Sequence, residues 1–149
     1  MESNAIKSGI LVVLGAIGGF ISTLFGGWNS ALTTLVIFMA VDYIMGIIVA
    51  GVFRKSGKSE NGGLSSRAGW KGLCKKIFGL IIVLVAVRLD ITIGTTFVKD
   101  AVAIGYIANE TLSIIENAGL MGIPIPGALK KAIDVLKQNS GEPDTTEYK

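Results

Sequence analysis

The side chains of this sequence that could do chemistry are ionisable groups placed inside apolar segments. Asp42 lies within the run VIFMAVDYIMGIIVAGVFRK, residues 36–55, and no charged residue occurs between Ser8 and Val41. A carboxylate inside a membrane span costs roughly 3 kcal/mol on insertion scales, and ionisable residues at such depth usually serve function. We therefore predict that Asp42 faces protein or water at a functional helix contact. The alternative is a carboxylate satisfied by one neighbour in a static bundle.

Further polar side chains repeat at helical spacing in the second half of the chain. Arg88, Thr92, Thr95 and Lys99 fall on one face of a helix, with Asp90 pointing elsewhere. A second stripe of mainly acidic and amide side chains begins at Asn109. The candidate intramembrane polar or pore-lining residues are Asp42, Arg88, Asp90, Thr92, Thr95, Lys99, Asn109, Glu110, Ser113 and Glu116.

The two stripes carry opposite charge, which leads to a specific hypothesis. If the chain turns near Lys99, Arg88 and Glu110 lie at equal depth and form an ion pair across a helical hairpin. The alternative is that both stripes are solvated faces of helices lying at the membrane interface.

Catalytic chemistry has few candidate residues here. The sequence has no histidine and one cysteine, Cys74, so the commonest general base, the commonest metal ligand and an internal disulfide are absent. It also lacks a glycine-rich phosphate loop, metal-ligand spacing and a nucleophile elbow. We predict that the protein is not an enzyme and has no catalytic residues, no cofactor, no metal and no nucleic-acid partner.

The segments that must position these residues are long and apolar. Half of the residues are hydrophobic and only 17% are charged, which predicts an all-α integral membrane protein with three to four transmembrane helices. We expect a single membrane domain over 1–137 and a polar, disordered tail over 138–149. Within the domain the expected elements are helices at about 10–25, 32–53, 77–98 and 101–115, a basic loop at 54–76 and an amphipathic helix at 128–137.

Small residues mark the faces where these helices could pack closely. Gly15 and Gly19 lie four residues apart in the first helix, and Gly46 and Ala50 follow Asp42 at the same spacing in the second. Such spacing allows helix backbones to approach, within one chain or between copies. These four residues are the predicted helix-packing positions.

The charge distribution predicts the topology. Residues 54–76 hold seven Lys or Arg and one Glu, so this segment is expected on the cytoplasmic side. With four crossings, both termini are then cytoplasmic. The second half of the basic segment could form a short helix at the membrane interface, which fits the same orientation.

Three stretches carry a resemblance to a known family: VDYIMGI, LSSRAGWKGLCKK and YIANETLSIIENAGLMGIPIPGALKKAIDVL. In this order and spacing they resemble the toxin secretion/phage lysis holin family, which includes clostridial phage holins and a holin-like protein linked to toxin release. The resemblance covers most of the chain, from the second helix to Leu136. It implies a protein that accumulates in the bacterial cytoplasmic membrane and homo-oligomerises into lesions that pass folded proteins, an endolysin or a toxin.

The predicted function is therefore that of a bacteriophage holin, with pore formation and host cell lysis as its outcome. Its expected partners are itself, the phospholipid bilayer and an endolysin or secreted toxin as cargo. Two other functions fit the residues: a small proton-coupled oligomeric transporter that uses Asp42, and a membrane anchor that recruits a cytoplasmic partner through the basic segment.

Overall fold

The computed structural model describes residues 2–140, which form five α-helices joined by short connections. In chain order these are α1 (Glu2–Leu24), α2 (Ser30–Ile48), α3 (Ser66–Ile93), α4 (Phe97–Leu120) and α5 (Gly127–Ser140), with a π-helical turn, η1 (Val49–Phe53), extending α2. No strand occurs among the described residues, so the predicted all-α class is confirmed.

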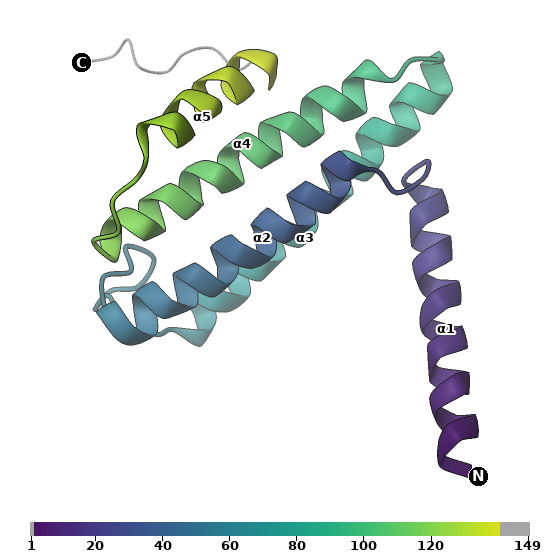
Figure 1. Cartoon of the computed structure of the whole chain (residues 1–149), viewed down its shortest axis with the longest axis horizontal. Coiled ribbons are helices and arrows are strands. Elements are labelled where there is room, and N and C mark those ends of the chain that lie inside the picture. Colours follow the sequence, from purple (N-terminus) through teal and green to yellow (C-terminus); the bar gives the residue numbers. More distant parts are fainter. Residues whose placement is uncertain (1, 141–149) are drawn as a thin grey trace.

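Helices α2, α3 and α4 pack side by side into a three-helix bundle, and α5 returns along α4 (Figure 1). The core of the bundle is formed by buried apolar side chains at helical spacing in α2, Leu32, Leu35 and Met39, which meet Val83 and Ile107. Asp42 continues the same face of α2 beyond Met39. The helical spacing that places the apolar side chains of α2 in the core therefore also places the Asp42 carboxylate there.

Helix α1 stands apart from the bundle and points away from it (Figure 1). Its side chains from Asn4 to Ile21 are exposed, and none of the segment Asn4–Leu24 is buried. Two segments are long and apolar enough to cross a membrane, Asn4–Leu24 and Ser30–Phe53. Since α1 is apolar on all sides, its natural surroundings are lipid or other protein.

The turn between α3 and α4 is held by Asp90. Its carboxylate accepts hydrogen bonds from the Thr95 hydroxyl at 2.6 Å and from the backbone N–H of Lys99 at 2.8 Å. Gly94 has φ of +72°, a conformation that glycine adopts without steric cost. Asp90 thus satisfies donors at the start of α4 that would otherwise lack partners.

The helix bounds differ from the sequence prediction in several places. Helix α3 begins at Ser66, inside the segment 54–76 predicted as a loop, because the Ser65 side chain accepts a hydrogen bond from the N–H of Ala68 and caps the helix. The turn after α3 falls at 94–96 instead of near Lys99. Helix α5 continues to Ser140, into the predicted tail, and 141–149 lie outside the described residues.

Candidate functional site

Three charged side chains, one from each helix of the bundle, meet in its interior. The Lys76 ammonium of α3 lies 2.7 Å from Oδ2 of Asp42 in α2 and also hydrogen-bonds Oε2 of Glu110 in α4. The Lys76 side chain is 13% exposed and the two carboxylates are 7% and 8% exposed. We refer to Asp42, Lys76 and Glu110 as the ion cluster.

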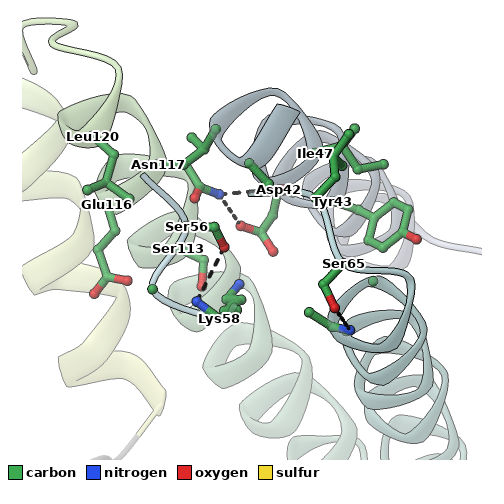
Figure 2. A pocket seen from close by; sticks show the side chains of 18 of the residues that line it. Asp42, Tyr43, Ile47, Ser56, Lys58, Ser65, Ser113, Glu116, Asn117 and Leu120 are labelled. Atoms are coloured by element: carbon green, nitrogen blue, oxygen red, sulfur yellow. Dashed lines mark hydrogen bonds between the residues drawn. The ribbon is translucent and has the colours of Figure 1, made fainter. Parts of the chain in front are cut away.

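Asn117 completes the polar environment of Asp42. Its side-chain amide donates to Oδ1 of Asp42 at 2.9 Å and to the Asp42 backbone carbonyl at 3.4 Å, and Figure 2 shows the two side chains pointing toward one another. Asn117 lies seven residues after Glu110, so both occupy one face of α4. Helix α4 therefore contacts the acid of α2 directly through Asn117 and indirectly through Lys76.

The ion cluster makes the three helices depend on one another. Every buried side-chain nitrogen or oxygen among the described residues has a hydrogen-bond partner, so this closed arrangement leaves no orphaned polar atom there. Taking charges out of water is costly, and a buried ion pair gives little net stability, but removing one partner leaves a charge without compensation. The ion cluster is therefore stable only while α2, α3 and α4 remain packed together.

Two cavities flank the ion cluster. The smaller, of about 250 Å³, lies between α2, α4 and the loop 54–65, with Tyr43, Lys58 and Ser65 among its lining residues (Figure 2). The larger, of about 530 Å³, is bordered by the first turns of α3 and by α4. Each is large enough to hold several water molecules next to the charges. Asp42 and Lys76 line both cavities, so the ion cluster lies next to two cavities that can hold water.

The structure contradicts the predicted pair of Arg88 with Glu110. Arg88 is exposed, and Glu110 pairs with Lys76. The reason is the position of the turn. Gly79 of α3 lies opposite Tyr106 of α4, since a side chain added at Gly79 would meet that ring. The two helices are antiparallel, so one turn back in α3 corresponds to one turn forward in α4, and Lys76 therefore lies opposite Glu110.

The other predicted polar residues occupy different surroundings, and their pore-lining role stays a prediction. Thr92 is exposed. Asp90, in the last turn of α3, accepts hydrogen bonds from Thr95 in the turn 94–96 and from the backbone of Lys99 in the first turn of α4. Asn109 and Ser113 border the larger cavity, and Glu116 borders the smaller one.

Among the described residues, the three predicted packing glycines have open space where a side chain would stand. A side chain added at Gly15, Gly19 or Gly46 would meet nothing within 4 Å, whereas Ala50 is buried. The close approach within the bundle occurs at Gly79 instead, where an added Cβ would lie 3.2 Å from Tyr106 and 3.3 Å from Met39. The glycines of α1 are therefore available for a contact outside the chain.

Sequence reasoning missed Lys76. It places Asn117 on the polar face that begins at Asn109, but it does not predict the contact of Asn117 with Asp42. The signal for Lys76 was present: the buried face of α3 includes Gly79, Val83 and Ala86, and the same spacing continued backward reaches Lys76. The position of Lys76 at the end of the basic segment 54–76 conceals this signal. Asn117 lies on the face of α4 that carries Glu110, and no feature of its immediate neighbours distinguishes it.

The ion cluster lies within a region shared with known proteins. The sequence profile of the bacteriophage holin family matches residues 19–138, which include α2, α3 and α4. The chain belongs to the bacteriophage holin family. Among its relatives, an uncharacterized protein of Listeria monocytogenes is 41% identical over 138 residues, covering 92% of this chain and 90% of the relative.

Other relatives of this holin-family chain come from clostridia and from a phage. An uncharacterized 14.9 kDa protein of Clostridium perfringens is 38% identical over 135 residues, covering 89% of this chain and 93% of the relative. A probable holin of Bacillus phage phi105 is 30% identical over 112 residues, covering 74% and 77%. No solved structure is significantly similar to the chain. Family membership and the two apolar helices identify a membrane protein.

Proposed function

We propose that this holin-family chain homo-oligomerises in the bacterial cytoplasmic membrane into lesions that release an endolysin, or a toxin, and so permit cell lysis. The observation that carries the proposal is the family match over 19–138, because it covers the whole bundle and its ion cluster. The probable holin of phage phi105 supports the same function.

A single subunit is suited to accumulate without harm. Its bundle pairs Asp42 and Glu110 with Lys76 internally. Its outer surface along α3 is apolar from Ile77 to Val85, with Phe78 and Ile82 among the exposed side chains. A bundle with an apolar exterior and paired polar groups inside is stable in lipid, so each copy can remain closed while copies accumulate.

Assembly would use the surface that the closed subunit leaves uncovered. Helix α1 is apolar, packs against no other helix of the described chain and carries Gly15 and Gly19 on one face. In lipid, helices associate through such small-residue faces. Because the fraction of assembled chains rises steeply with concentration, lesions would form once a threshold density is reached.

In the lesion, the polar residues of the bundle would line water. Opening the bundle would separate the ion cluster and expose Asp42, Lys76 and Glu110, together with Asn109 and Ser113 beside the larger cavity. Water would then replace the partners that each charge loses. The driving contacts of assembly are thus the α1 faces, and the polar residues determine the cost of leaving the closed state.

We also propose the membrane orientation. The loop 54–65 and the first turns of α3 carry the basic residues and would lie on the cytoplasmic side. Helices α1 and α2 cross the membrane, and α3 and α4 cross as a hairpin against α2, which places both termini in the cytoplasm. Cysteine accessibility at the loop 54–65 and at the turn 94–96, measured in intact cells, tests this orientation.

Inducible expression in bacteria tests the function. Cells that produce the chain alone should lose membrane potential and viability at a defined time, and cells that also produce a cytoplasmic endolysin should lyse at that time. Endolysin alone should not lyse the culture. An anchor would leave the membrane potential and the cytoplasmic proteins in place, and a transporter would leave the cells viable. Either result would refute the holin proposal.

A further inference from the structure

The larger cavity has a strongly cationic wall. Four of its lining residues are lysines: Lys58 from the loop 54–65, and Lys71, Lys75 and Lys76 from the first turns of α3. They face two carboxylates, Asp42 and Glu110. With a volume of about 530 Å³, the cavity has room for a group much larger than water.

Within residues 2–140, only one of these lysines is neutralised by a carboxylate of the chain. Lys76 binds both carboxylates of the ion cluster. Among the described residues, no carboxylate oxygen lies within 4.0 Å of the ammonium groups of Lys58, Lys71 or Lys75. Lys71 and Lys75 are also four residues apart on one helix, a spacing at which like charges repel. An anion in the cavity would relieve this repulsion.

Position along α3 indicates where the anion comes from. Trp70 is exposed just before Lys71, and Leu73 is exposed among the lysines. After the lysines, all exposed side chains from Ile77 to Val85 are apolar. In membrane proteins tryptophan and lysine mark the headgroup level, and apolar side chains mark the hydrocarbon. The cavity therefore lies at the depth of lipid phosphates, and Met39 in its wall provides apolar surface for the glycerol region.

We propose that this cavity binds the phosphate group of an anionic phospholipid. Lys58, Lys71 and Lys75 hold the phosphate, and the Asn109 and Ser113 side chains can donate to the remaining headgroup oxygens. The inference depends on the bundle being embedded in a membrane, as in the proposed function, but not on lesion formation. A lipid bound there contacts α3 and α4 beside the ion cluster and stabilises the closed bundle.

Native mass spectrometry of the purified full-length chain tests the site. The protein would be presented with mixed micelles containing equal amounts of phosphatidylglycerol and phosphatidylcholine. The wild type should retain phosphatidylglycerol preferentially. The Lys71→Gln/Lys75→Gln variant should bind it about 25-fold more weakly, since each lysine near an anionic headgroup contributes a factor of about five. Circular dichroism establishes that the variant remains folded.

A matched control removes the same charge elsewhere. Lys130→Gln/Lys131→Gln deletes two exposed lysines of α5 that do not line the cavity, and it should bind as the wild type does. Equal losses in variant and control would overturn the proposal, and so would equal retention of the two lipids. Displacement of the lipid by an equal concentration of inorganic phosphate would assign the site to a soluble anion and also overturn it. The measurement reports binding and not lysis, so failure of this proposal and failure of the holin proposal are distinguishable.

Discussion

Replacing Lys76 by methionine is expected to destabilise the closed bundle severely. Methionine preserves much of the lysine side chain's length but removes the only cation that Asp42 and Glu110 contact within residues 2–140. Two carboxylates then face one another with side-chain exposures of 7% and 8%, where water can solvate them poorly. The substitution tests whether the ion cluster holds the three helices together.

The size of the effect follows from the burial of the pair. Breaking a buried ion pair by removing one partner costs about 3 to 5 kcal/mol, because the remaining charge is left uncompensated. We expect Lys76→Met to lower the free energy of unfolding by that amount, measured by reversible chemical unfolding in detergent micelles with circular dichroism. Lys75→Met is the control in micelles free of anionic phospholipid: the adjacent lysine is exposed, and without bound lipid its loss should change stability by less than about 0.5 kcal/mol.

A compensating variant separates lost charge from lost packing. Adding Asp42→Asn and Glu110→Gln to Lys76→Met removes the orphaned charges while retaining similar side-chain shapes, and should recover at least about half of the stability. If Lys76→Met is no more destabilising than Lys75→Met, the ion cluster does not hold the bundle. If the triple variant recovers nothing, packing accounts for the loss and charge does not.

Three further predictions follow from other parts of the structure. Asp90→Ala should reduce the free energy of unfolding by about 1 to 2 kcal/mol, because α4 loses its N-terminal cap, and Asp90→Asn should lose less; equal effects would argue against capping. Gly79→Leu should destabilise the bundle by at least about 1 to 3 kcal/mol, because its added atoms meet Tyr106 and Met39, whereas Gly15→Leu should leave unfolding unchanged. The Gly15→Leu/Gly19→Leu variant should keep the bundle but delay lysis and reduce oligomers seen by cross-linking; wild-type timing would exclude this face from assembly.

The all-α class was predictable because the spacing of apolar residues and the length of the apolar segments are both typical of helices. Helix α2 shows this, since its buried residues Leu32, Leu35 and Met39 repeat at the spacing that leads to Asp42. The interior position of Asp42 followed from the cost of exposing a carboxylate to lipid. Local pattern and global packing agree in this helix.

The partner of Glu110 could not be predicted in the same way. Pairing across a hairpin depends on where the turn falls, and a displacement of one helical turn changes the residue that lies opposite. The predicted turn near Lys99 aligned Glu110 with Arg88, whereas the turn at 94–96 aligns it with Lys76. Asp90 and Gly94 together specify that turn. Interpreting Asp90 as an intramembrane charge hides its role as a helix cap.

The isolation of α1 also lay beyond sequence reasoning. Gly15 and Gly19 permit packing within a chain or between chains, and their spacing is the same in both cases. The structure gives α1 no partner among the described residues, which leaves its glycine face for lipid or for other copies.

Cross-linking at α1 during lysis tests the central claim most directly. In a Cys74→Ser background, Gly15→Cys would be expressed with an endolysin, and an oxidant would be added to samples taken before and at the onset of lysis. Since each chain then carries one cysteine, disulfide formation captures pairs of α1 helices, and an amine-reactive bifunctional reagent that joins lysines extends these pairs to higher oligomers. The account predicts mainly monomers early and dimers and higher oligomers at lysis. Lysis on schedule with the chain still entirely monomeric would contradict it.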